Sequence, residues 1–283
     1  MIAPRSTVGA STRIRNTIDN TDWLKTAAII VFTIDHFGYF FVENADWWSA
    51  IGRLSAPPFF FLLGYAQARN VPLRWLWLGI GLTVLDSWNN NWEWMAPNIL
   101  FSLAAIRLLR PYVQMFMERY GWLAFVLLVA GLIAMLPVAG KVVDYGAQGW
   151  MWALFGFLQR ASVDRQGAAE VEGSPDQSTS PPLATVNNIG LMRLIGCLIT
   201  VVVFVWQEQK EFLFPEIQLA FVFVYVGAFA LAMTQFKRGA ARIQPPAPVA
   251  AAMHFIGRYT LELYALQLAS FELTILLRPD LAG

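Results

Sequence analysis

The segment Trp23-Leu-Lys-Thr-Ala-Ala-Ile-Ile-Val-Phe-Thr-Ile-Asp-His-Phe-Gly-Tyr39 is apolar over most of its length. With its flanking residues it approaches the about 20 residues that a helix needs to cross a hydrocarbon core. Two ionisable residues, Asp35 and His36, lie well inside it. Ionisable side chains at such depth are costly and normally face a bundle interior or a water-filled cavity. The segment therefore predicts a transmembrane helix that carries a functional site.

The composition extends this prediction to the whole chain. Of its 283 residues, 57% are hydrophobic and 14% charged, whereas soluble domains have about 45–50% apolar and about 25% charged residues. We predict an all-α, polytopic transmembrane helix bundle with about nine spans. The third, fourth and sixth are short enough to be tilted, re-entrant or partly interfacial. The predicted spans are residues 24–42, 51–68, 72–87, 95–109, 120–138, 142–158, 190–206, 217–235 and 253–277.

The distribution of basic residues predicts the orientation. With nine spans and a cytoplasmic N-terminus, sixteen of the twenty Lys and Arg residues fall on the inner side, as the positive-inside rule requires. Only Arg53, Lys141, Lys210 and Arg278 fall outside. We therefore expect the N-terminus in the cytoplasm, the C-terminus outside, and a location in the bacterial inner membrane. The polar start lacks a cleavable signal, so the first span is expected to direct insertion.

The predicted organisation is two groups of helices joined by a linker. Residues 1–160 hold six helices and residues 189–283 hold three, in one membrane domain. Residues 161–188 are rich in Ser, Pro, Gly, Asp and Glu, a composition typical of disordered segments. The net charge of +1 and the absence of a basic run give no indication of nucleic-acid binding. One cysteine and two histidines predict neither a disulfide nor a metal site.

Helix geometry relates His36 to Lys25. These residues are eleven positions apart, about three turns of a helix, and therefore lie on one face about 16 Å apart along the axis. This spacing suits a long ligand with an anionic head at the inner surface and a reactive group inside the membrane. A lysine that only anchors the helix at the interface is the simpler interpretation of Lys25 alone. Asp35 points 100° away from His36, so contact between the two cannot be assumed.

Other polar residues lie near the expected outer ends of spans. Arg53 is placed to pair with Asp35, to bind an acceptor, or to act as an interfacial arginine. The Pro57-Pro58 pair is expected to kink the second span. Asn98 is well explained as a helix cap, and Asp144-Tyr145-Gly146 opens the sixth span. Arg258 is expected to pair with Glu262 four residues later.

Several short segments occur in a fixed order over about the first 160 residues. They are Leu24-Lys25, Ile34-Asp35-His36-Phe37-Gly38, Ile51-Gly52-Arg53-Leu54, Pro58-Phe59, Gln67-Ala68-Arg69-Asn70, Pro97-Asn98-Ile99-Leu100-Phe101, and Asp144-Tyr145-Gly146 with Gly149. Together they resemble the TraX family, membrane proteins associated with N-acetylation of conjugative pilin. The first and last spans also look like the broader membrane acyltransferase superfamily, which includes polysaccharide O-acetyltransferases. In that group a basic residue, ten intervening residues and a histidine mark the first helix, as Lys25 and His36 do here.

The resemblance implies an acetyltransferase with acetyl-CoA as a cytoplasmic donor. His36 would be the catalytic base or an acetyl-carrying nucleophile, supported by Asp35. Lys25, Arg69 and Arg74 would bind the donor phosphates. The last helix departs from the superfamily pattern, because Gln267 stands where a histidine often follows Tyr264. Residues expected to support the substrate, the oxyanion or the structure are Arg53, Asn98, Asp144, Tyr145 and Tyr264.

Several alternatives remain at this point. The acceptor implied by the family is the N-terminal amine of a pilin, but a hydroxyl of a surface glycan fits the same topology. A transporter would use Asp35 and His36 as a proton relay, usually within an inverted repeat that we do not find. A non-enzymatic membrane partner of a pilus or secretion assembly would tolerate substitution of both residues. In every case the chain is expected to contact membrane lipid.

Overall fold

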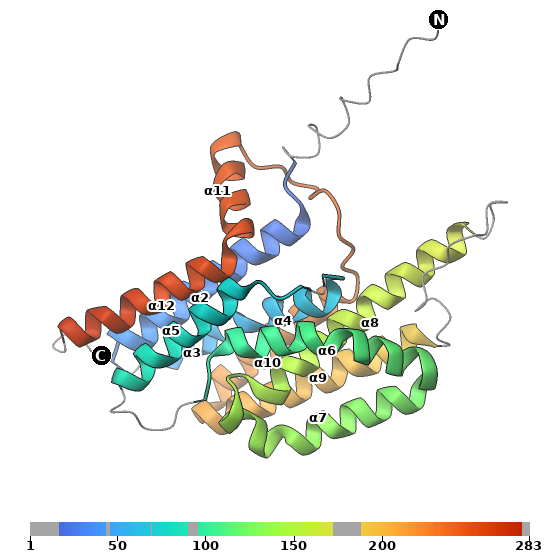
Figure 1. Ribbon diagram of the computed structural model, residues 1–283, viewed down its shortest axis with the longest axis horizontal. Coiled ribbons are helices and arrows are strands. Elements are labelled where there is room, and N and C mark those ends of the chain that lie inside the picture. Colours follow the sequence, from blue (N-terminus) through green and yellow to red (C-terminus); the bar gives the residue numbers. More distant parts are fainter. Residues whose placement is uncertain (1–16, 44–45, 69, 90–95, 172–187, 279–283) are drawn as a thin grey trace, which may run out of the picture.

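The computed structural model describes residues 17–43, 46–68, 70–89, 96–171 and 188–278 (Figure 1). Within these residues all regular structure is helical, and the only β-type contact is an isolated bridge between Asp19 and Ala240. The all-α fold class is therefore confirmed. The helices are α2 (Asn20–Phe41), α3 (Asp46–Gly52), α4 (Ala56–Tyr65), α5 (Leu73–Asn89), α6 (Ile99–Tyr120), α7 (Trp122–Val142), α8 (Gly146–Val171), α9 (Ile189–Phe212), α10 (Glu216–Met233), α11 (Ala247–Arg258) and α12 (Thr260–Leu277).

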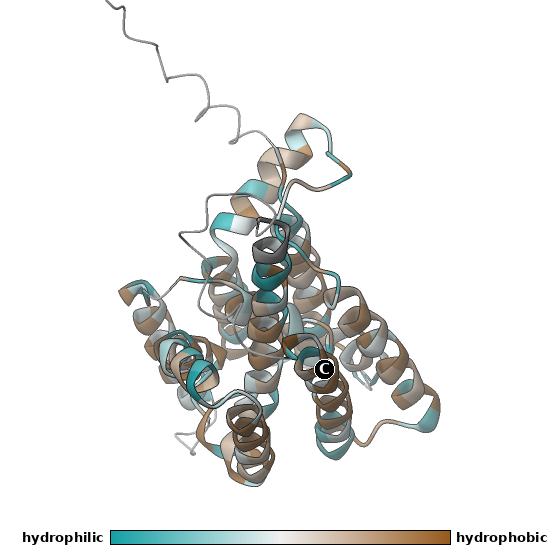
Figure 2. Cartoon of the chain, turned by 90° about the vertical axis from the view of Figure 1, so that its right-hand side faces the viewer, coloured by the Kyte–Doolittle hydropathy of each residue, from teal (hydrophilic) through white to brown (hydrophobic). Residues whose placement is uncertain are grey.

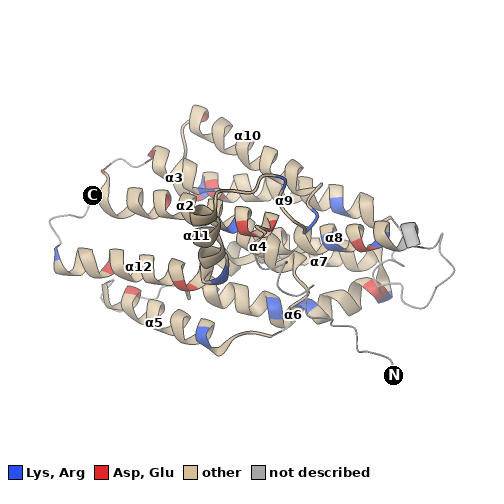
Figure 3. Ribbon diagram, turned by 90° about the horizontal axis from the view of Figure 1, so that it is seen from above, with Lys and Arg blue, Asp and Glu red and all other residues tan. Residues whose placement is uncertain are grey.

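Six helices of the described chain are long and apolar enough to cross a membrane, namely α2, α6, α7, α9, α10 and α12. Hydrophobic residues cover much of the helical surface in Figure 2, and most of it is neither acidic nor basic in Figure 3. The chain is thus a multi-pass membrane protein. The remaining predicted spans, 51–68, 72–87 and 142–158, fall largely on α4, α5 and α8.

Two predicted spans are broken in the structure. The span predicted at 51–68 is interrupted after Gly52, and α4 begins at Ala56 with prolines in its first turn. Proline is well tolerated there because the first amides of a helix have no intrahelical partner. The predicted kink at Pro57-Pro58 is therefore wrong, and these prolines begin a helix. The span predicted at 253–277 is divided at Tyr259 into α11 and α12, which meet at a steep angle in Figure 1.

Two helices are longer than predicted. Helix α6 continues from the predicted end at 109 to Tyr120, through Pro111. Helix α8 continues to Val171, into the segment 161–188 that was predicted to be a linker. The Arg160–Asp164 ion pair at 2.8 Å joins successive turns there, and Ala, Gln, Glu and Arg favour helix in this stretch. Residues 172–187 of that predicted linker lie outside the described part.

Helix α4 lies at the centre of the bundle, with all ten residues buried. Its backbone approaches α8 directly. A Cβ at Gly64 would lie 1.8 Å from the Ala153 carbonyl oxygen, and one at Gly156 would lie 2.0 Å from the Phe61 carbonyl oxygen. Small residues permit such close helix contacts in membranes. This contact fixes the segment before α4, which carries Arg53, deep in the protein.

Candidate active site

A cavity of about 450 Å³ lies at the end of the bundle where α2, α5, α7 and α9 finish and α6 and α8 begin. Its lining includes seven of the residues singled out from the sequence, which come from separate parts of the chain. They are Asp35, His36, Arg53, Asn98, Asp144, Tyr145 and Tyr264. The cavity therefore assembles most of the predicted site, whereas Lys25 and Arg74, two of the residues expected to bind donor phosphates, are not in its lining.

Arg53 is the centre of a buried ion network. Its Nη2 donates to Asp35 Oδ1 and its Nη1 to Glu208 Oε2, each at 2.9 Å, while Nε donates to the Ser49 carbonyl at 2.9 Å. The guanidinium also lies over the Phe212 ring, 4.0 Å from its centroid. Every nitrogen of the guanidinium thus has a partner. The predicted pairing of Arg53 with Asp35 is found, and the arginine is not simply interfacial.

Glu208 is a site residue that the sequence analysis missed. It is 1% exposed, and its second carboxylate oxygen accepts a hydrogen bond from Gln148 Nε2 at 3.2 Å. The predicted seventh span ended at residue 206, whereas α9 continues to Phe212. Glu208 was therefore counted as part of an external loop. An acidic residue one turn before the end of an apolar helix is the sequence feature that could have indicated this site residue.

A glycine allows the network to form. Gly52 precedes Arg53 at the end of α3 and is buried against α2. A Cβ at this position would lie 2.0 Å from Asp35 Oδ1. Only glycine therefore lets the α3 backbone approach α2 closely enough for Arg53 to reach both carboxylates.

His36 lies beside the network but is held by aromatic rings. The centroid of its ring is 4.2 Å from the centroid of the Phe32 ring, in an edge-to-face arrangement, and 6.1 Å from that of the Tyr264 ring. Its Nδ1 is buried and has no hydrogen-bond partner among the described residues. Asp35 is committed to Arg53 and does not orient His36. His36 is therefore a cavity-lining imidazole that neighbouring aromatic rings hold in position.

Asn98 has a structural role in the site. Asn98 Oδ1 caps α6 by accepting from the Leu100 amide at 3.0 Å, as predicted. Its Nδ2 donates to the Gly79 carbonyl at 2.7 Å and to Thr83 Oγ1 at 3.1 Å. Both amide hydrogens of Asn98 therefore point at protein acceptors and not at a ligand.

Asp144 and Tyr145 form the turn between α7 and α8. Asp144 Oδ1 accepts from the Tyr145 amide at 2.9 Å, and Tyr145 has a positive φ of 57°. A non-glycine residue with this conformation is uncommon and clusters at functional sites. The turn directs the tyrosine toward the cavity, where its ring packs against Phe60.

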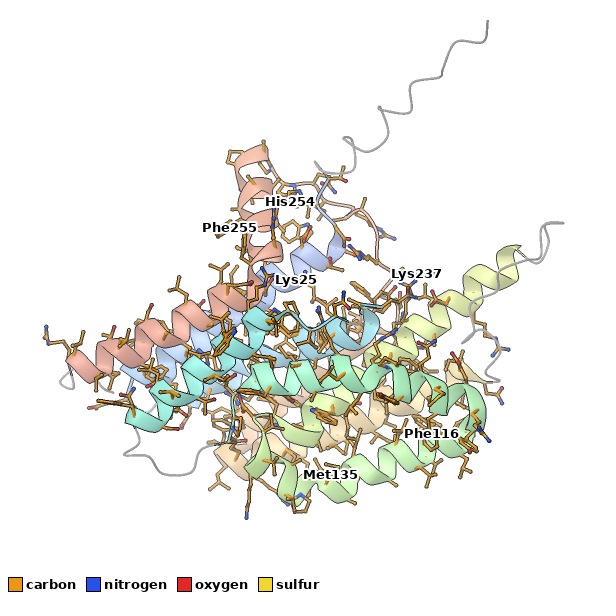
Figure 4. All side chains as sticks on the ribbon, viewed as in Figure 1. Lys25, Phe116, Met135, Lys237, His254 and Phe255 are labelled. Carbon is orange, nitrogen blue, oxygen red and sulfur yellow. The ribbon has the colours of Figure 1, made fainter. Side chains whose placement is uncertain are left out.

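Two of the predicted phosphate-binding residues, Lys25 and Arg74, lie away from the cavity. Lys25 Nζ donates to the Gly257 carbonyl at the end of α11, at 3.0 Å, next to His254 in Figure 4. Arg74 pairs with Glu262 at 2.8 Å, so the predicted Arg258–Glu262 pair is wrong, because the carboxylate turns toward α5. Arg69 lies outside the described residues.

Lys25 nevertheless shares a side of α2 with His36. Lys25 contacts α11, and His36 faces Tyr264 of α12, as the helical spacing predicts. The charges of Arg107 and Arg238 lie within electrostatic range of Lys25, as do those of Asp19 and Asp22. Arg238 is paired with Asp19 at 2.9 Å, so cations and carboxylates are mixed at the end of α2 that is opposite the cavity.

The cavity wall is strongly acidic. Besides Asp35, Asp144 and Glu208, it includes Asp86, Glu211 and Glu272, which the sequence analysis did not assign to the site. Glu272 accepts a hydrogen bond from Asn89 Nδ2. Six carboxyl groups thus face a cavity whose basic members are Arg53 and His36. Within the described residues no group of three or more His, Cys, Asp or Glu side chains is arranged to hold a metal ion.

Comparison with known proteins places the chain in a family. It is 26% identical over 144 residues to an uncharacterized protein, RP591, of Rickettsia prowazekii (strain Madrid E). That match covers 51% of the chain and 57% of the relative, so the chain spans less than two thirds of the relative's length. No solved structure matches it significantly. The TraX protein family matches residues 20–235, which include every helix from α2 to α10, and the chain therefore belongs to the TraX family.

Proposed function

We propose that the protein is a membrane-embedded acetyltransferase that moves an acetyl group from cytoplasmic acetyl-CoA to an amine on the outer side. One observation carries the proposal: His36 lines a polar cavity inside the membrane domain, together with Arg53, Tyr145 and Tyr264. A neutral imidazole can accept a proton from an attacking nucleophile. The family suggests the N-terminal amine of a conjugative pilin as the acceptor.

The donor would enter at the end of α2 that is opposite the cavity. Lys25, with Arg107 and Arg238 nearby and Arg69 and Arg74 from the same boundary, would hold the phosphates of acetyl-CoA. The pantetheine arm would then run along the side of α2 that faces α11 and α12. Lys25 and His36 are about 16 Å apart along the helix axis, a separation that suits the length of a pantetheine arm.

The chemistry requires one proton acceptor and one oxyanion donor. The acceptor nitrogen attacks the thioester carbonyl carbon, and His36 takes the proton that the nitrogen loses. The carbon–sulfur bond then breaks, and the imidazolium returns the proton to the leaving thiolate. The hydroxyl of Tyr145 or Tyr264 is the available donor to the oxyanion, because the amide of Asn98 is occupied. Transfer through an acetyl-histidine is the variant of this scheme.

The acidic wall supports an amine acceptor over a glycan hydroxyl. An amine arrives at neutral pH mainly as an ammonium ion, which carboxylates attract, whereas a neutral sugar gains no such attraction. Glu211 is exposed and lines the cavity from α9, while Asp86 and Glu272 line it from α5 and α12. One of these carboxylates would take the first proton from the ammonium and leave the nucleophilic amine.

His36→Ala provides the test. In membrane vesicles, the variant is expected to lose at least about a hundredfold in transfer of labelled acetyl from acetyl-CoA to an amine peptide. Phe37→Leu is the matched control, because Phe37 is the next residue on α2 and is 44% exposed. Full transfer by a normally inserted His36→Ala would overturn the proposal.

The same vesicles separate the competing functions. A transporter would show proton or substrate flux without acetyl-CoA, and a non-enzymatic partner would show neither flux nor transfer. Lys25→Glu tests the donor site separately, since it should abolish acetyl-CoA binding while the cavity remains intact. Unchanged binding of acetyl-CoA to this variant would remove Lys25 from the donor site.

A further inference from the structure

A second cavity lies on the other side of the bundle from the candidate active site residues on α2. It is a groove of about 340 Å³ between α6, α7 and α8, and nearly all of its lining is apolar. Its α7 wall extends from Leu127 to Met135, about 12 Å along the helix axis. Figure 4 shows Met135 on this helix, away from Lys25. Leu127 and Met135 are both 51% exposed, so the groove opens toward the surrounding membrane.

A buried arginine gives this apolar groove a charge. Arg110 lines it, is 6% exposed and lies 5.7 Å from the centroid of the Phe157 ring. One turn earlier on α6, Arg107 donates to the Asn70 carbonyl in the connection between α4 and α5. Arg110 therefore lies near the level at which α4 ends and α5 begins. An acyl chain would fill the apolar wall, and an anionic headgroup would complement the guanidinium.

We propose that this groove is a binding site for one anionic phospholipid of the membrane. The phosphate would contact Arg110, and an acyl chain would lie between α6 and α7 along Gly131. Basic pockets between transmembrane helices bind anionic headgroups, and an acyl chain makes close packing contacts with apolar side chains. The lipid would also pack on Trp150, whose indole donates to Ser102 Oγ at 2.9 Å. No described residue lines both the groove and the active-site cavity, so this site is distinct from the one proposed for catalysis.

Two variants remove the two halves of the site. Arg110→Gln removes the charge, and Arg119→Gln on the same helix, outside the groove lining, is its control. Gly131→Leu fills the groove, since a Cβ at Gly131 meets no atom within 4 Å. Gly81→Leu is its control, because Gly81 is equally open but lies on α5. Both leucines replace glycine within a helix, where leucine is the better helix former, so folding is not endangered.

The measurement is lipid retention by the full chain in detergent, followed by native mass spectrometry. Phosphatidylglycerol and phosphatidylcholine with the same acyl chains are the probes. The wild-type chain and both controls should retain one phosphatidylglycerol in preference to phosphatidylcholine. Arg110→Gln should lower phosphatidylglycerol retention about tenfold, and Gly131→Leu should lower retention of both lipids.

Three results would overturn the proposal. They are equal retention of the two lipids by the wild type, unchanged retention by Arg110→Gln, and equal retention by Gly131→Leu and Gly81→Leu. A dimer that is lost only in Gly131→Leu would instead assign the groove to a second copy of the chain.

Discussion

At the scale of single residues, the cavity depends on how one buried cation is neutralised. Arg53 is 7% exposed and Glu208 1%, so neither charge is stabilised by water. Each is stabilised by the other and by the hydrogen bonds around them. Such a network makes little net contribution to stability, but removal of one member leaves an uncompensated buried charge. The Arg53 network fixes the part of the cavity wall that lies next to His36.

Arg53→Met is expected to destabilise the protein by about 3–5 kcal/mol, since it leaves Asp35 and Glu208 buried without a cation. Adding Glu208→Leu to Arg53→Met should recover part of this loss, because the second uncompensated charge is then gone. Thermal unfolding of the purified protein in detergent measures both effects. Equal melting of Arg53→Met and the wild type would contradict the network as described. A double variant less stable than Arg53→Met would contradict the coupling.

At the scale of elements, short helices and turns bring the polar groups into the bundle. The break between α3 and α4 places Arg53 at the level of Asp35. Non-helical backbone at membrane depth is tolerated where protein or a water-filled cavity surrounds it. Asn98 has a comparable role, because it begins α6 and ties it to α5 through Gly79 and Thr83.

The two roles of Asn98 can be separated. Asn98→Ser retains an oxygen that can cap α6 but loses both donors to α5, whereas Asn98→Ala loses the cap as well. The cap should be worth about 1 kcal/mol, so the alanine variant should be the less stable by about that amount. Unfolding of both variants in detergent tests this order. Equal stability would show that the cap contributes nothing measurable.

At the scale of the whole molecule, α2 and α12 run parallel. Lys25 near the start of α2 contacts Gly257 just before α12, and Phe41 at the end of α2 packs on Phe271, 5.2 Å between ring centroids. The start of α2 and the end of α12 therefore lie at opposite ends of the bundle. The predicted topology, with the two ends of the chain on opposite sides of the membrane, stays a prediction that this arrangement permits.

Reporter fusions test that topology. Alkaline phosphatase folds only outside the cytoplasm, so it should be active when fused after Gly283 and inactive when fused before α2. A fluorescent protein that matures in the cytoplasm should give the opposite pattern. The same reporter active at both ends would contradict a parallel α2 and α12 that both cross the membrane.

The sequence by itself determined the all-α membrane fold, because hydropathy and helical spacing are local properties that the bilayer imposes. It also identified Asp35, His36 and Arg53, since ionisable residues are conspicuous in apolar segments. Only the tertiary structure decided which groups meet. Glu208 lies 155 positions from Arg53. Glu262 pairs with Arg74 on another helix and not with Arg258, the partner expected from the spacing. The sequence also did not predict that two spans are interrupted, one after Gly52 and one at Tyr259. Packing between helices selects such ion pairs and interruptions, and this packing leaves no local pattern in the sequence.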